Sequence, residues 1–205
     1  MASTNRGKAG EVERLICAAL GECSARLCVL HLGDLPPEPP PSEDGQTYLD
    51  NARIKALAAS RRLPGAAVLA DDSGIEIDAL GGRPGIHSAR WGVSPGSPVL
   101  APDALNAHLL NELRGVPAAK RTARMVAVVV LRLSDGTEVL GRGAVSGRIA
   151  TEARGGGGFG FDSIFLLPDG RRLSEVGPEV KDAYSHRGQA IAAIIPGLSA
   201  WLESF

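Results

Sequence analysis

Apolar positions recur at helical spacing in four stretches of the chain. Val12 and Ile16 begin one such stripe, so a helix is expected over residues 8–20. Further helices are expected over residues 47–62, 103–113 and 185–195. The helix over 47–62 opens on Thr47 with Asp50 three residues later, which is the pattern of a capping box.

Short apolar runs, and runs that alternate between apolar and polar residues, predict the strands. These are expected over residues 26–32, 66–70, 74–80, 122–133, 138–149 and 164–167. A Ser-Asp-Gly-Thr turn at 134–137 joins the two longest strands, and a Pro-rich acidic loop covers 34–46. Because helices alternate with strands early and a hairpin follows, the sequence predicts an α/β fold with a mixed sheet.

The charge balance and the composition exclude several classes of protein. Lys and Arg number 22 and Asp and Glu 23, so neither a nucleic acid polymer nor an anionic membrane is expected as a partner. No apolar run approaches the roughly 20 residues that span a bilayer, and the first six residues lack the apolar core of a signal peptide. We therefore expect a cytoplasmic protein. The cysteines at 17, 23 and 28 lack metal-site spacing and are expected to be free thiols.

Two adjacent carboxylates, Asp71 and Asp72, follow the apolar run 66–70. In extended backbone they point to opposite faces, so only one of them can face a given cleft. Open α/β sheets bind ligands beyond the carboxyl ends of their strands, where a carboxylate can hold Mg²⁺ or orient water. The alternative is a solvated turn, because Asp-Ser-Gly is common in turns.

The segment Ser-Thr-Asn-Arg-Gly-Lys at residues 3–8 leads into the first expected helix. Exposed N–H groups at a helix start attract anions and Lys8 adds a full charge, which is the chemistry of a phosphate cradle, although the segment is not a Walker A sequence. In the second helix Thr47, Asn51 and Lys55 form a polar stripe at a spacing of four, and Glu43 lies in the loop just before it. The alternatives are an ordinary helix cap, an exposed helix face and an acidic loop.

Two aromatic residues stand among glycines in the segment 157–162, Gly-Gly-Phe-Gly-Phe-Asp. Small neighbours leave a ring face open for a flat ligand, and Asp162 can accept a hydrogen bond from a ring N–H. Further along, the segment 181–188 carries several hydrogen-bond donors. The alternatives are a bulged strand with core Phe residues and a Ser N-cap followed by a basic first turn.

Taken together and in this order, five segments resemble the inosine triphosphate pyrophosphatase family, which acts on non-canonical purine nucleoside triphosphates. They are STNRGK at 3–8, EDGQTYLDNA at 43–52, ADDSG at 70–74 with GGRPGIHSAR at 81–90, GFGFD at 158–162 and SHRG at 185–188. The resemblance covers nearly the whole chain. It implies one domain over residues 1–205, built on an elongated mixed sheet flanked by helices, with two lobes and a central nucleotide cleft.

The same resemblance implies an activity. Family members hydrolyse ITP, dITP and XTP to the monophosphate and pyrophosphate, need Mg²⁺, and are typically cytosolic homodimers. By position, Asp72 is expected to be the base for water attack on the α-phosphorus and a ligand of Mg²⁺, with Glu43 as a second metal ligand. The substrate-binding residues implied in this way are Ser3, Thr4, Asn5, Arg6, Gly7, Lys8, Lys55, Ser73, Phe159, Gly160, Phe161, Asp162, Lys181, His186 and Arg187.

Within this set the resemblance divides the work between the two ends of the nucleotide. Asn5, Lys8 and Lys55 are expected to hold the triphosphate, Ser73 to line the site and Phe159 to stack on the base. Asp162, Lys181, His186 and Arg187 are expected to read the base edge. A donor such as Arg187 pairs with the 6-oxo group of inosine or xanthine but is left unpaired by the 6-amino group of adenine, which costs about 1–3 kcal/mol or more.

Two departures from the family pattern leave other functions open. The family carries an apolar strand before the phosphate loop, whereas only Met1 and Ala2 precede Ser3 here, so we expect further residues upstream, a compensating contact or an impaired enzyme. The usual Tyr-Asp-Pro is Phe161-Asp162-Ser163. The alternatives are therefore a pyrophosphatase for other modified nucleotides and, if the strand is absent, a catalytically weak nucleotide-binding module.

Overall fold

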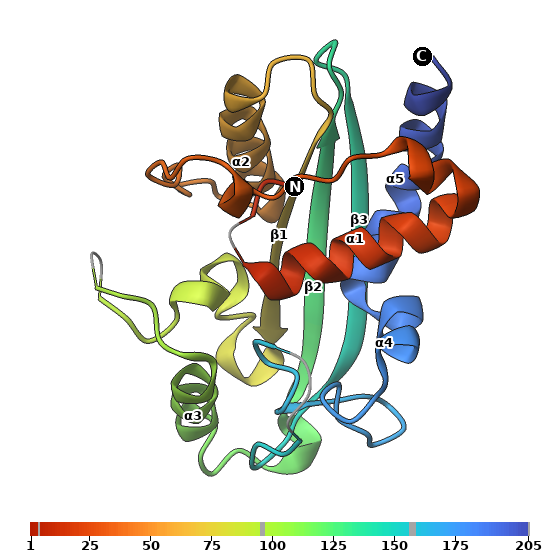
Figure 1. Ribbon diagram of the computed structural model, residues 1–205. Coiled ribbons are helices and arrows are strands. Elements are labelled where there is room, and N and C mark those ends of the chain that lie inside the picture. The colour runs from red at the N-terminus through yellow and green to blue at the C-terminus, as the bar shows by residue number, and fades with distance from the viewer. Residues whose placement is uncertain (4, 95–96, 156–158, 205) are drawn as a thin grey trace. The chain divides into compact units, whose positions relative to one another are not determined.

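Four strands form one sheet in the order β1-β2-β3-β4 (Figure 1). The computed structural model describes residues 1–3, 5–94, 97–155 and 159–204. The strands are β1 (Val68–Ile77), β2 (Thr122–Arg132), β3 (Glu138–Ile149) and β4 (Phe165–Leu166). The hairpin between β2 and β3 closes where the Leu133 N–H donates to the Thr137 carbonyl, and β4 pairs antiparallel with β3. The predicted α/β class is confirmed, with an antiparallel arrangement of the described strands.

Five α-helices accompany the sheet within the described ranges. They are α1 (Arg6–Leu20), α2 (Tyr48–Arg62), α3 (Pro102–Glu112), α4 (Pro178–Tyr184) and α5 (His186–Glu203). The four expected helices are confirmed, whereas the short helix α4 was not predicted. The last helix runs beyond the predicted end at 195 and contains Pro196, because Leu198 and Leu202 continue its buried apolar stripe. No helix in the described part of the chain is long and apolar enough to cross a membrane.

Contacts divide the chain into two compact units. The first unit comprises Met1–Asp72, Ala127–Gly143 and Tyr184–Phe205, and the second comprises Ser73–Val126 and Ala144–Ala183. The core of the second unit includes Ile75, Leu109 and Phe165, all completely buried. The expectation of one domain over residues 1–205 stays a prediction.

In the first unit the strands carry apolar side chains on both faces. Leu69 and Val129 pack with α1 and α5, whereas Val68, Ala70 and Val130 pack with the alanines of α2. This is the alternation that extended strands impose, since successive side chains point to opposite faces. The alternation also decides where the next two residues of β1 point, as described below.

The two strands predicted near this region are one strand in the structure, so that prediction was wrong. Residues 66–70 and 74–80 were expected to be two strands, but Val68–Ile77 is one continuous strand, so Asp71 and Asp72 lie within β1 rather than at its end. The Asp-Ser-Gly segment is compatible with a turn but also with extended backbone, and pairing in the sheet selects the extended form.

The expected strand over residues 26–32 was also wrong. Residues 27–31 lie between two short 3₁₀ helices, Gly21–Arg26 and Leu32–Asp34, and belong to no strand of the described sheet. Here the Met1 ammonium group donates to the Leu30 carbonyl (2.7 Å).

Next to it the Ala2 N–H donates to the Leu69 carbonyl (2.7 Å), which gives β1 a backbone partner at this point. A cavity of about 200 Å³, lined mainly by apolar side chains of the first unit, adjoins these residues.

Candidate functional site

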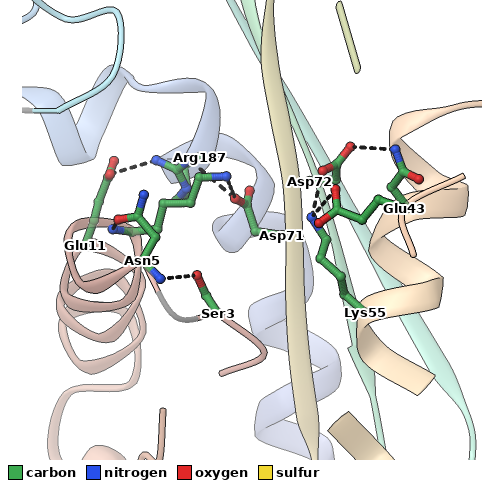
Figure 2. A network of polar contacts seen from close by, with 10 residues as sticks. Ser3, Asn5, Glu11, Glu43, Lys55, Asp71, Asp72 and Arg187 are labelled. Atoms are coloured by element: carbon green, nitrogen blue, oxygen red, sulfur yellow. Dashed lines mark hydrogen bonds and ion pairs between the residues drawn. The ribbon is translucent and has the colours of Figure 1, made fainter. Parts of the chain in front are cut away.

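The two neighbouring carboxylates of β1 point to opposite faces of the sheet. Asp71 continues the row of Leu69 and faces α1 and α5, whereas Asp72 continues the row of Val68 and Ala70 and faces α2. Figure 2 shows the two side chains on either side of the β1 ribbon. Each carboxylate meets a lysine on its own side, so the strand separates two acid–lysine pairs.

On the first side, Asp71 is a completely buried acid between two cations. Its Oδ2 lies 3.0 Å from Lys8 Nζ and 3.4 Å from Arg187 Nη2. Arg187 in turn donates from Nη1 to Glu11 Oε2 (2.7 Å), and both of those side chains are 2% exposed. Burial alone raises the pKa of Asp71, but the nearby charges of Arg187 and Lys8 outweigh it and hold that pKa well below its ordinary value.

Helix α1 brings Lys8 to this position. The Asn5 side chain caps the helix by accepting a hydrogen bond from the Lys8 N–H (3.1 Å), and the Ser3 hydroxyl accepts one from the Asn5 N–H (3.1 Å). Asn5, Arg6 and Gly7 are exposed at the helix start. Thr4 lies outside the described residues. The predicted loop is thus a capped helix N-terminus with Lys8 in its first turn.

Helix α5 brings Arg187 to Asp71 because of a glycine in the sheet. Ser185 caps α5 by accepting from the Gly188 N–H (2.9 Å), so His186 and Arg187 occupy its first turn and are buried. A Cβ at Gly143 of β3 would collide with the His186 carbonyl oxygen. The glycine therefore permits the helix N-terminus to lie directly on the strand.

On the second side, Asp72 meets α2 and the loop before it. Lys55 Nζ lies 2.7 Å from Asp72 Oδ1 and 3.8 Å from Glu43 Oε2, so the ammonium group stands between two carboxylates. Burial is the largest influence on the pKa of Asp72 and leaves it above its ordinary value, although Lys55 acts in the opposite direction. A partly buried carboxylate whose pKa is raised is a better proton acceptor than an exposed one.

Asn51 joins the loop that carries Glu43 to this carboxylate. Its Oδ1 accepts from the Gly45 N–H (3.0 Å), and its Nδ2 lies 3.5 Å from Asp72 Oδ2. The capping box of Thr47 and Asp50 is confirmed and fixes the start of α2. Two members of the predicted polar stripe, Asn51 and Lys55, therefore contact Asp72, whereas Thr47 caps the helix.

The aromatic segment lies in the second unit and forms its own polar cluster. Asp162 Oδ2 accepts from the Phe159 N–H (2.8 Å) and from Lys181 Nζ (2.6 Å), and the Lys181 ammonium lies 4.5 Å from the centroid of the Phe159 ring. Phe161 is 7% exposed and belongs to the core of the unit. Lys181 thus covers one face of the Phe159 ring as a cation–π partner.

Asn106 of α3 holds the turn of this segment. Its Nδ2 donates to the Gly160 carbonyl (2.9 Å) and to the Ser163 hydroxyl (3.1 Å), and the residue is 2% exposed. Ser163 stands where the family pattern carries Pro, so two hydrogen bonds restrain a turn that lacks the ring.

The structure therefore divides the predicted site residues between the two units. Lys8, Lys55, Glu43, Asp72 and Arg187 come together in the first unit around β1. Half-buried Ser73 follows Asp72 along β1, and Gly160 lies in the turn held by Asn106. Arg187 was expected to read the base edge, but its described contacts are with Glu11 and Asp71.

Three residues with contacts in these clusters, Glu11, Asn51 and Asn106, were not predicted as site residues. Glu11 had a recognisable signal, because an acidic residue beside Val12 on the apolar stripe of α1 needs a buried partner. Asn51 was visible in its stripe. The partners of Asn106 are more than 50 positions away along the chain, so no local pattern indicated them.

Comparisons with known proteins agree over almost the entire chain. A family model described as the Ham1 family matches residues 1–196. A dITP/XTP pyrophosphatase of Symbiobacterium thermophilum is 45% identical over 203 residues, which cover 99% of this chain and 95% of that relative. One of Mycobacterium tuberculosis is 44% identical over 200 residues, covering 97% of this chain and 93% of the relative.

Solved structures are similar as well. The Ham1 protein of Staphylococcus aureus has a TM-score of 0.78 and 33% identity, covering 97% of this chain and 96% of that one. A nucleoside-triphosphatase, also named dITP/XTP pyrophosphatase, of Mycobacterium abscessus has a TM-score of 0.68 and 37% identity, covering 95% of this chain and 96% of its own.

Proposed function

The chain belongs to the Ham1 family, and on that premise we propose that it hydrolyses the non-standard purine nucleoside triphosphates ITP, dITP and XTP to the monophosphate and pyrophosphate. The observation that carries this proposal is the pair of acid–lysine contacts on the two faces of β1, Lys8 with Asp71 and Lys55 with Asp72. The relatives named dITP/XTP pyrophosphatase support the substrate class.

A triphosphate carries about four negative charges, which repel an attacking hydroxide and accumulate on the leaving group. Lys8 sits in the first turn of α1, where the helix N-terminus adds its own attraction for anions. Lys55 is held by Asp72 and Glu43. We expect both ammonium groups to turn toward the phosphates when a nucleotide binds.

Asp72 is the proposed base. The water oxygen forms a bond to the α-phosphorus, the bond from that phosphorus to the α–β bridging oxygen breaks, and the water proton passes to Asp72. The leaving oxygen departs on pyrophosphate, where Lys8 or Lys55 neutralises its charge. The burial that raises the pKa of Asp72 favours proton acceptance.

Asp72 and Glu43 also fit a divalent cation. Their carboxylates flank the Lys55 ammonium, and Mg²⁺ is usually held by one or two carboxylates with substrate phosphates completing its shell. Bound there, Mg²⁺ would supply charge neutralisation for the phosphates. We propose it as the cofactor, held by Asp72 and Glu43.

For the base, we propose that the second-unit cluster of Phe159, Asp162 and Lys181 binds the purine. Lys181 lies over the Phe159 ring, and an aromatic ring of this kind can stack on a purine. Ser3, Asn5, Arg6, Gly7, Ser73, Gly160, Phe161 and His186 keep their proposed place in substrate binding. The same proposal applies to Thr4.

Resemblance to the family also supports a cytoplasmic homodimer as the working form of this protein. Light scattering on the purified chain tests the dimer, because a monomer mass at micromolar concentration contradicts it. Cell fractionation tests the compartment, and recovery in the membrane pellet contradicts it.

Pyrophosphate release tests the function directly. The purified protein is assayed with ITP, XTP, dITP, ATP and GTP, with Mg²⁺ and with a chelator. We expect Mg²⁺-dependent release from the first three in clear preference to the last two. Turnover of a different modified nucleotide would favour the alternative substrate, and binding without release would favour a nucleotide-binding module.

A substitution tests the assigned base. Asp72→Asn should abolish pyrophosphate release while ITP still binds, as measured by calorimetry. Asp169→Asn is the control, because Asp169 pairs with Arg171 on the surface of the second unit and should leave turnover unchanged. Near-normal turnover by Asp72→Asn would refute the role of Asp72.

A further inference from the structure

We propose that Glu11, Arg187 and Asp71 are positioning residues that hold the Lys8 ammonium group ready for the triphosphate. This inference rests on the proposed function, because it assigns the purpose of Lys8. It adds three buried residues to the phosphate side of the site, and it gives Arg187 a task other than reading the base.

The polar contacts form one continuous series from the protein interior to Lys8. Glu11 Oε2 lies 2.7 Å from Arg187 Nη1, Arg187 Nη2 lies 3.4 Å from Asp71 Oδ2, and the same Oδ2 lies 3.0 Å from Lys8 Nζ. Figure 2 shows Glu11, Arg187 and Asp71 in this order on one side of β1. Three elements contribute, α1, α5 and β1, so no single local segment sets the geometry.

The exposed fraction of the side chains falls steeply along this series of contacts. The Lys8 side chain is 23% exposed, whereas the other three side chains are 0–2% exposed. A ligand can therefore reach Lys8 but not the interior residues. The series therefore has a solvent-accessible cation at one end, Lys8, and three buried residues that hold it.

The order of charges explains why three residues are needed. Asp71 alone would attract Lys8 strongly but would be an expensive buried anion, and Arg187 reduces that cost by sharing the carboxylate. Glu11 balances Arg187, so the four charges sum to zero before a nucleotide arrives. Lys8 is thereby held in one place by an acid that is already partly neutralised and can release it to a phosphate.

The buried position of Arg187 separates this role from base reading. Its guanidinium is 2% exposed and its described hydrogen bonds go to Glu11 and Asp71. A residue that acts through Lys8 affects every triphosphate alike, whereas a residue that reads the 6-oxo group affects ITP more than ATP. The ratio of kcat/KM for ITP and ATP therefore distinguishes the two roles.

A double-mutant cycle between Asp71 and Lys8 tests the inference. Asp71→Asn, Lys8→Gln and the double variant are compared for kcat and KM with ITP and for the Kd of inorganic tripolyphosphate, a probe without a base. We expect each single variant to bind tripolyphosphate about tenfold more weakly and the double variant to resemble Lys8→Gln, because contacting residues are not additive. Multiplicative effects in the double variant would overturn the inference.

Glu11→Gln keeps the Asp71–Lys8 contact and removes the negative charge that balances Arg187. It should lower kcat/KM for ITP and ATP by the same factor, with unchanged selectivity, and a selective loss for ITP would overturn the positioning role. The control is Arg53→Gln, which removes a cation of an exposed ion pair in the same unit and should be additive with Lys8→Gln.

The tripolyphosphate titration keeps this test separate from the proposed function. If the wild-type protein releases no pyrophosphate but the binding cycle is non-additive, the function is wrong and the inference holds. If pyrophosphate is released and the cycle is additive, the function holds and the inference is wrong.

Discussion

Replacing Asp71 by Asn should destabilise the protein by an amount that depends on pH. The substitution keeps the shape of a side chain that is completely buried and removes its charge, leaving Lys8 and Arg187 without their shared counter-ion. Removing one partner of a buried ion pair typically costs about 3–5 kcal/mol. Since a domain is stable by about 5–15 kcal/mol, the variant should still fold.

The sign of the pH dependence follows from the lowered pKa of Asp71. Its stabilisation is complete above the ordinary value of 3.8 and is lost as the pH falls toward the lower value in the folded state. At pH 3 the difference in unfolding free energy between wild type and variant should thus be about 1 kcal/mol smaller than at pH 7.

Urea unfolding followed by circular dichroism measures this difference. Both proteins are titrated with urea at pH 7, 5 and 3, with a chelator present to remove metal ions. Because wild type and variant are compared at each pH, the contributions of all other titrating groups cancel. We expect the difference in unfolding free energy between wild type and variant to be equal at pH 7 and 5 and smaller at pH 3. A difference that is absent at pH 7, or that grows at pH 3, would refute the buried ion-pair account.

Three further substitutions test how the site is supported. Gly143→Ala should cost about 1–3 kcal/mol in thermal unfolding and lower kcat/KM, because its Cβ would displace α5; unchanged activity would contradict this. Asn106→Ala should cost about 1–3 kcal/mol in urea unfolding and raise KM for ITP, because the Gly160 carbonyl loses its donor. An unchanged KM would contradict a role of Asn106 in holding this turn for substrate binding. Thr47→Ala should cost about 1 kcal/mol in urea unfolding, and no loss would show that the capping box does not stabilise α2.

The helices and the long hairpin could be predicted from the sequence because their signals are local. The capping box at Thr47 and the turn at 134–137 depend on residues close together in the chain, and the structure has both. The strand at 26–32 could not be judged in this way, since an apolar run becomes a strand only where a partner offers free backbone groups. For the same reason β1 continues through Asp71 and Asp72, where the sequence suggested an end.

The candidate site was predictable in its residue types but not in its partners. Sequence spacing indicated that Lys55 belongs to a polar stripe of its helix, and the structure adds that it contacts Asp72. Arg187 lies 116 positions from Asp71 and 176 from Glu11, so their contact depends on the packing of α5 against the sheet. The base-reading role inferred for Arg187 came from its position in a motif, whereas its contacts come from tertiary structure.

The two acids of β1 also fix the register of that strand. A slip by one residue in one direction would place Ala70 opposite Arg187 and Lys8, and a slip in the other would place Ser73 opposite Lys55. Either misalignment leaves a cation without its carboxylate. The charges that we propose to serve a polyanionic substrate thereby also exclude misaligned forms of the sheet while the chain folds.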